Sequence, residues 1–168
     1  MAIRSLLQFL LMLTFAACGS TAEPAGGAAW HIVFEELSGA LFSVAGTSQD
    51  NVWAVGAEQA GGQGPTVLHW DGTTWTAEPT GLASGDLYWV HVFEGGPVFV
   101  AGSEGRILRR TKTTFQKMAT PDSQTVWGMW GASPEDMWAV GGPAGAGTGF
   151  IWRYRGDAWE AVVLEAGL

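Results

Sequence analysis

Cysteine and charge are scarce in this chain of 168 residues. It has one Cys, which excludes both a framework of disulfides and a cluster of thiolate metal ligands. Charged residues make up 14% of the chain, well below the roughly 25% of an average soluble domain. Lys and Arg number 8 against 16 Asp and Glu, so that the net charge is −8. A module that binds the phosphate backbone needs the opposite sign, and we therefore expect no nucleic-acid partner.

Catalytic and cofactor motifs are also missing from the sequence. The three histidines, His31, His69 and His91, are not spaced as metal ligands usually are. No Gly-x-Ser-x-Gly elbow occurs, and neither Gly-rich run, 61–64 or 141–149, leads into the Lys-Ser/Thr pair of a phosphate-binding loop. We therefore predict no metal, no cofactor and no catalytic site in this chain.

The first residues have the character of an export signal. Arg4 precedes an apolar run that is too short to span a hydrocarbon core of about 30 Å as a helix. The run ends in FAAC, which resembles the lipobox of bacterial lipoproteins, where the Cys sulfur is acylated and the chain is cleaved before it. The resemblance implies a signal peptide over 1–17, a lipid anchor on Cys18 and a flexible tether over 18–29. The alternative is an ordinary signal peptide with an incidental Cys.

The rest of the chain, 30–168, is a repeat region. The tryptophans of the blocks DNVWAVGA and DMWAVGG are 85 residues apart, and a weaker copy lies between them, so that each unit spans about 42 residues. Such a period, built of short β-type runs, is typical of propeller blades or a related β array. We place the units at about 30–75, 76–115 and 116–159, followed by a final strand.

Each unit is predicted to form four short antiparallel strands and no helix. Short runs rich in Val, Trp, Phe and Ile are separated by turn sequences, which is the pattern of strands. Asp71-Gly72 predicts a hairpin turn, because Gly accepts positive φ without steric cost. In the first unit the four strands are expected around Phe42, Trp53, Leu68 and Trp75.

The blocks DNVWAVGA, VLHWDGTTW and DMWAVGG resemble the Trp/Gly-repeat β-propellers of secreted bacterial lipoproteins. They are also similar to kelch units, in which a Gly pair precedes a Tyr/Trp turn position and a later Trp. Gly141-Gly142, Tyr154 and Trp159 match that pattern, whereas the second unit does not match it well. The resemblance implies an all-β fold, a propeller-type array of about three four-stranded antiparallel blades, and is nearly silent about activity.

Three units are fewer than the 4–8 blades with which propellers usually close. An open array of three blades exposes apolar sheet faces, which soluble proteins avoid. We therefore expect an incomplete propeller. Either the chain is part of a longer protein, or two copies associate to close one ring.

The 10 tryptophans divide into two groups. Those at repeat-equivalent positions are expected to be framework residues that pack the blades together. This framework comprises Trp30, Trp53, Trp75, Trp138 and Trp159, with Trp127 in a further set beside Phe42 and Tyr88. By contrast, Trp89, Trp130 and Trp152 break the repeat. Trp89, His91 and Trp130 share strand parity on the first strands of their units. We predict that these three form a ligand-facing surface that stacks on sugars or flat rings; the alternative is that they fill gaps in the core.

A basic or titratable residue recurs at one level of all three units. Arg109 aligns with His69 and Arg153. These residues are predicted to form an arc that attracts an anionic glycan, a surface polymer or an acidic partner. The alternative is a solvated strand whose cations pair with nearby acids, where each exposed pair contributes only about 0–1 kcal/mol.

These features predict an envelope-anchored binding or scaffolding module for a glycan or protein ligand, attached to the membrane through Cys18. Gly19 after the Cys favours an outer-membrane lipoprotein; otherwise we expect a secreted protein. The alternative function is a carbohydrate-active enzyme, a hydrolase or lyase, whose catalytic units are missing from this chain. A fragmentary gene product without a function of its own is a third alternative.

Overall fold

The computed structural model describes residues 31–33, 35 and 37–163. The chain divides into two compact units, Met1–Glu35 and Glu36–Leu168, and every strand of the described residues lies in the second. These strands form three four-stranded antiparallel sheets, and the described residues include no helix. This confirms the predicted all-β, blade-like fold.

The first sheet, sheet A, is an up-and-down meander. Its last turn has the predicted chemistry: Asp71 Oδ1 accepts hydrogen bonds from the N–H groups of Thr73 (2.9 Å) and Thr74 (2.8 Å). Gly72 adopts the positive φ that this turn requires, 93°. The strands of sheet A lie at the four predicted levels and are β1 (Leu41–Ser48), β2 (Asn51–Glu58), β3 (Pro65–Trp70) and β4 (Trp75–Ala77).

Sheets B and C repeat the same meander. Sheet B comprises β5 (Leu87–Val92), β6 (Val98–Gly102), β7 (Ile107–Thr111) and β8 (Thr114–Lys117). Sheet C comprises β9 (Val126–Ser133), β10 (Asp136–Gly141), β11 (Phe150–Tyr154) and β12 (Trp159–Ala161). Trp53, Phe99 and Trp138 occupy the same register position on the second strands, as the alignment predicts.

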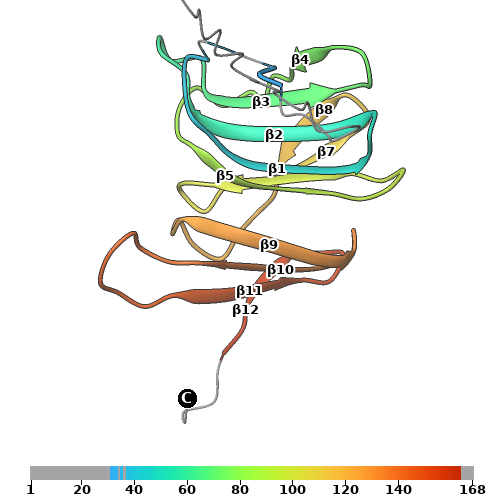
Figure 1. Cartoon of the computed structure of the whole chain (residues 1–168). Coiled ribbons are helices and arrows are strands. Elements are labelled where there is room, and N and C mark those ends of the chain that lie inside the picture. The colour runs from blue at the N-terminus through green and yellow to red at the C-terminus, as the bar shows by residue number, and fades with distance from the viewer. Residues whose placement is uncertain (1–30, 34, 36, 164–168) are drawn as a thin grey trace, which may run out of the picture. The chain divides into compact units, whose positions relative to one another are not determined.

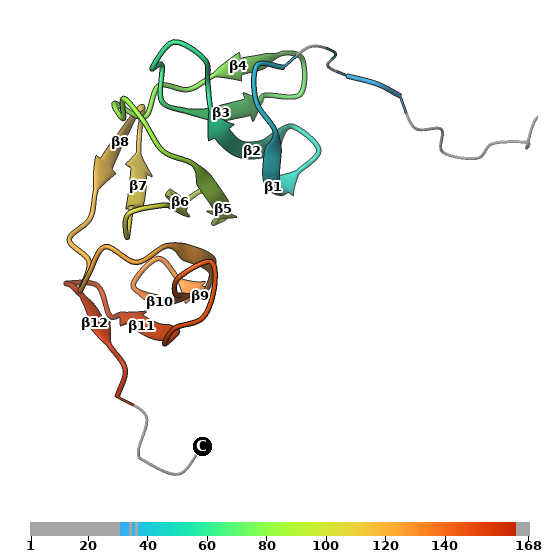
Figure 2. The same cartoon turned by 90° about the vertical axis from the view of Figure 1, so that its left-hand side faces the viewer.

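The three sheets lie side by side and fan out from their first strands (Figures 1 and 2). β5 lies between β1 and β9, so that neighbouring sheets meet along their first strands. Successive side chains of a strand point to opposite faces of its sheet. The face that carries Val44, Val90 or Met129 is called the leading face. The opposite face of the same sheet is called the trailing face.

The trailing face of each of the first two sheets packs on the leading face of the next. Trp53 and Val55 of sheet A share one core with Val90, Val100 and Leu108 of sheet B. A second core joins the trailing face of sheet B to the leading face of sheet C and contains Phe99, Ala101, Ile107, Met129 and Ala139. Within the described residues, no sheet covers the leading face of sheet A or the trailing face of sheet C, and the array is open.

The glycine at the same place in every second strand meets a packing requirement. The chain that leads into each first strand passes so close that a side chain has no room. The following residue donates its N–H to the same carbonyl oxygen, at 2.8 to 3.0 Å. A Cβ would lie 2.0 Å from Ala40 O at Gly56, 1.9 Å from Asp86 O at Gly102 and 2.1 Å from Thr125 O at Gly141.

Several predictions concern residues outside this description. The signal peptide over 1–17, the anchor Cys18, the tether up to residue 29 and the framework Trp30 all lie outside the described residues. In the part of the chain that is described, no helix has both the length and the apolar character needed to cross a membrane.

Candidate functional site

Each sheet has a β-bulge near the start of its first strand, and each bulge presents an aromatic residue. The pairing register shifts between Leu41 and Ser43, and the same shift recurs at the equivalent places of sheets B and C. A bulge leaves one residue out of the ladder and re-aims its side chain. The extra residues are Phe42, Tyr88 and Trp127, which are called the aromatic row.

The rings of the aromatic row form a continuous strip across all three sheets. The centroids of Phe42 and Tyr88 are 5.2 Å apart, and those of Tyr88 and Trp127 are 4.6 Å apart. Both separations are in the range of favourable aromatic pairs. Phe42 is 46% exposed and Trp127 is 39% exposed, while Tyr88 between them is half-buried. The strip therefore offers a solvent-facing aromatic surface.

Hydrogen bonds hold two of these rings in place. Tyr88 Oη donates to Asp86 Oδ2 over 3.0 Å, and Trp127 Nε1 donates to the carbonyl oxygen of Gly142 over 3.0 Å. Burial, followed by the nearby Asp86 carboxylate, raises the pKa of Tyr88, so that the phenol stays protonated and remains a donor. Rings fixed in this way lose little conformational freedom when a flat ligand stacks on them.

The structure places the three predicted stacking residues in different surroundings. Trp89 is partly exposed on β5 beside the row, and its Cε3 atom lies 3.9 Å from the position that a Cβ at Gly128 would take. His91 is half-buried and packs edge-on against Phe93, with centroids 4.6 Å apart. Trp130 is 59% exposed on the trailing face of sheet C. Trp89 is thus next to the aromatic row, whereas His91 lies in the contact between sheets B and C.

Sequence reasoning assigned Phe42, Tyr88 and Trp127 to the framework, and their rings do pack one sheet against the next, but it did not predict that Phe42 and Trp127 are exposed. Their equal positions in the three units were visible as a repeat. The bulge that exposes them was not visible, because no single residue type marks it in these segments. The one available signal was that the position near the start of the first strand is aromatic in all three units.

The predicted basic or titratable residues do occupy equivalent positions in the three sheets. Each of them already lies close to an acidic side chain of this chain. His69, Arg109 and Arg153 each lie opposite the framework aromatic residue of the second strand. His69 stacks on Trp53 at 4.1 Å, and Arg153 lies 4.6 Å over the ring of Trp138. Each also has a carboxylate nearby, with separations of 4.0 Å for His69–Glu78, 3.7 Å for Arg109–Glu135 and 3.1 Å for Arg153–Asp136. The arc prediction therefore concerns two arginines whose charge is partly neutralised locally and one histidine.

His69 belongs to a small polar network in sheet A. Asn51 Oδ1 accepts hydrogen bonds from Trp53 Nε1 (3.0 Å) and His69 Nε2 (3.0 Å), and Asn51 Nδ2 donates to Thr47 Oγ1 (2.8 Å). Burial lowers the pKa of His69, an effect that the nearby Glu78 carboxylate opposes only in part. Burial also lowers the pKa of His91. Both side chains are therefore held in the neutral form.

Stability is expected to fall as the pH drops below about 6.5, the ordinary pKa of His. In that range the unfolded chain binds protons at His69 and His91 that the folded chain excludes, so protonation favours unfolding. The check is the urea midpoint at pH 7.5 and at pH 5.5, where most carboxylates stay ionised. The double variant His69→Gln, His91→Gln is expected to show a smaller difference between the two pH values. An equal difference in both proteins would contradict this assignment.

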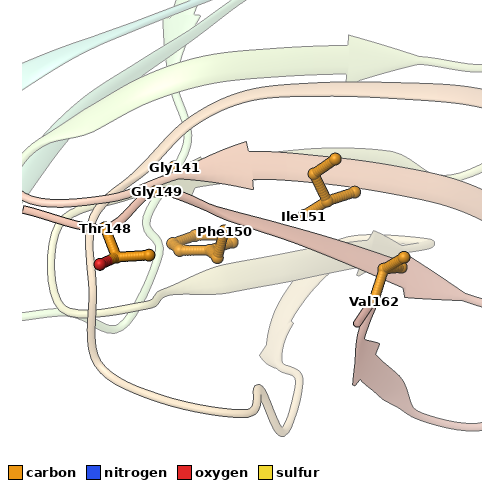
Figure 3. A pocket seen from close by; sticks show the side chains of 6 residues that line it. All are labelled: Gly141, Thr148, Gly149, Phe150, Ile151 and Val162. Atoms are coloured by element: carbon orange, nitrogen blue, oxygen red, sulfur yellow. The ribbon is translucent and has the colours of Figure 1, made fainter. Parts of the chain in front are cut away.

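A hollow of about 460 Å³ lies beside the β10–β11 connection of sheet C. Figure 3 shows its six lining residues, among which Phe150, Ile151 and Val162 supply the apolar side chains. None of the lining residues is ionisable, so this hollow offers no acid, base or nucleophile. A second hollow, of about 220 Å³, lies at the outer part of sheet A and includes Val67 and Glu78.

Metal-binding side chains are not gathered anywhere in the described residues: no group of three or more His, Cys, Asp or Glu is placed to hold an ion. The aromatic row is therefore the arrangement of side chains with the clearest recognition chemistry. No known protein family, no curated protein and no solved structure matches this chain.

Proposed function

We propose that this chain is a lipid-anchored binding module of the cell envelope that holds a carbohydrate ligand against the aromatic row. The observation that carries the proposal is the continuity of the row. Three sheets contribute one ring each, at 5.2 and 4.6 Å from one another, and the two outer rings are open to solvent.

The chemistry of the row favours sugars over charged ligands. Aromatic rings present an apolar face on which the C–H face of a sugar ring stacks, and aromatic side chains provide large contact areas at low entropic cost. Phe42, Tyr88 and Trp127 carry no charge, and Trp89, the residue after Tyr88, is also partly exposed. The two arginines at the predicted basic positions are engaged with carboxylates and are less suited to lead recognition.

The address of the module rests on the sequence. FAAC at 15–18 supports acylation of Cys18, and Gly19 supports the outer membrane as the destination. The similarity to kelch-like, Trp/Gly-repeat propeller lipoproteins supports the combination of an anchor, a tether and a β array. Without the anchor, the same module would be secreted.

The test compares two replacements of one ring. Trp127→Leu keeps an apolar side chain and removes the aromatic face, whereas Trp127→Phe keeps that face. Binding of cellohexaose and chitohexaose is measured calorimetrically on the full chain, in micelles of a detergent without a sugar headgroup. We expect Trp127→Leu to weaken binding by up to about tenfold, because an aromatic stack contributes up to about 1.5 kcal/mol. Trp127→Phe is expected to stay within about threefold of the parent chain, because the stacking face is retained.

Three results would contradict the proposal. If neither oligosaccharide binds the parent chain, the carbohydrate assignment is wrong. Equal affinities for both variants and the parent would show that the row is not the binding surface. Release of shorter sugars from either oligosaccharide would favour the alternative of a carbohydrate-active enzyme.

A further inference from the structure

The trailing face of sheet C is open at the positions that are covered in sheets A and B. Val140 is 48% exposed, although its equivalents Val55 and Ala101 are fully buried. Ile151 is half-buried, whereas its equivalents Val67 and Ile107 have almost no exposed surface. Sheets A and B bury these positions against the next sheet. The trailing face of sheet C therefore carries the residues of a sheet-to-sheet interface.

Two further residues extend this open face. Trp130 is the most exposed Trp of the described residues, and it pairs with Trp138 of the neighbouring strand β10 on the same face. Ile151 and Val162 line the hollow in Figure 3. Met118, the sheet B equivalent of Val162, packs against the core that joins sheets B and C. Ile151 and Val162 thus place one wall of the hollow on the face that lacks a neighbour among the described residues, whereas Phe150 packs against the core that joins sheets B and C.

The first strand of sheet A is open on the complementary side. Val44 is 68% exposed on its leading face, whereas Val90 and Met129 at the same position are buried against the preceding sheet. Leu41 is also exposed, although its equivalents Leu87 and Val126 are fully buried. The first strand of sheet A thus has the apolar pattern that receives a trailing face in sheets B and C.

Charge and ring contacts match across the two open faces as well. Arg109 of sheet B lies 3.7 Å from Glu135, in the β9–β10 turn of sheet C. Arg153 is the sheet C equivalent of Arg109, and the exposed Asp50 in the β1–β2 turn is the equivalent of Glu135. If the trailing face of one sheet C packed on the leading face of another copy's sheet A, Arg153 would lie near Asp50. This packing would also bring Trp127 toward Phe42, which continues the aromatic row.

We propose that the trailing face of sheet C docks on the leading face of sheet A in a second copy of this chain. We choose a second copy as the occupant because the leading face of its sheet A matches the trailing face of sheet C. The two faces match in their apolar residues, in their charges and in the positions of their aromatic residues. Two copies form the contact twice and close a ring of six sheets, within the usual range of 4–8 blades, whereas three copies would exceed it. This proposal is independent of the ligand that binds the aromatic row.

The test is the mass of the full chain by sedimentation equilibrium in density-matched micelles, where we expect twice the mass of one chain. Trp130→Glu and Val44→Glu each place a carboxylate in both contacts of the dimer and are expected to give monomers. Thr113→Glu, at an exposed position in the β7–β8 turn, is the matched control and is expected to stay dimeric. Far-UV circular dichroism verifies that each variant is folded.

Mixing the two monomeric variants gives a result that misfolding cannot produce. The Val44→Glu copy keeps an intact sheet C face, and the Trp130→Glu copy keeps an intact sheet A face. We expect a one-to-one mixture to form a heterodimer through this single intact contact. A monomeric parent chain, dimers of either variant alone, or no association in the mixture would each overturn the proposal. A monomeric parent that still binds oligosaccharide would leave the proposed function standing.

Discussion

Gly102→Ala is expected to lower the free energy of unfolding by about 3 kcal/mol, the upper part of the usual range for overpacking. The added Cβ would lie 1.9 Å from Asp86 O and 2.8 Å from the Cα of Leu87. Both are backbone atoms, so no side-chain rotation relieves the clash. Ser103 N–H also donates to Asp86 O over 3.0 Å, and separating the two segments would weaken that hydrogen bond. The measurement is the urea midpoint and slope of the parent and the variant.

The control for this prediction is Gly145→Ala. Gly145 lies in the β10–β11 connection, and a Cβ there would have no atom within 4 Å. Its effect is expected to stay within about 0.5 kcal/mol, as for most surface substitutions. If Gly102→Ala destabilised the chain no more than Gly145→Ala, the close approach at the three repeated glycines would not be a structural requirement.

Trp152→Ala is expected to cost about 3–5 kcal/mol, the usual range for removal of a large aromatic side chain from a core. Trp152 is 1% exposed, and its ring stacks on Phe150 with centroids 3.8 Å apart and an interplanar angle of 14°. It packs with Met129 and Ala139 in the core that joins sheets B and C. Truncation therefore leaves a cavity at the contact between two sheets. Chemical denaturation of the two proteins measures the difference.

Trp152→Leu is the matched variant for this position. Leu68 and Leu108 occupy the equivalent places in sheets A and B, so the fold accepts Leu there. The Leu variant is expected to lose clearly less stability than the Ala variant, because it fills part of the cavity. Equal losses for both variants would show that the specific ring contact with Phe150, rather than filled volume, stabilises this core.

The positions of the strands and turns were predictable because they depend on local sequence patterns. Trp53 and Trp138, 85 residues apart, reach the same register position because each follows a short polar turn and precedes a small residue and a valine. Asp71-Gly72 forms its turn from its own side chain and its own backbone freedom. Such features depend on residues within a few positions of one another, and a single sequence contains them.

The candidate site was predictable only in part. Trp89 was expected to be ligand-facing; it is partly exposed and directly follows Tyr88 of the aromatic row on β5. Tyr88, its neighbour, was taken as framework and is the central ring of the row. The difference between them depends on a bulge, which lies next to the close backbone contact between Leu87 and Gly102. A bulge adds one residue to the strand and interrupts its alternation, so the period of two that predicts the strand does not show which residue is left out of the ladder.

From its residue pattern alone, this chain specifies all-β units, four strands in each and the equivalence of positions among the three. The pattern did not specify which of two unusual tryptophans is buried: Trp152 fills a core, whereas Trp130 stands on an open face. Both lie on strands of sheet C with the same apolar character. Strand formation follows from local alternation and turn chemistry, but burial of a sheet face depends on whether another sheet lies against it. That contact is made between residues far apart in sequence, and only the packed structure reveals it.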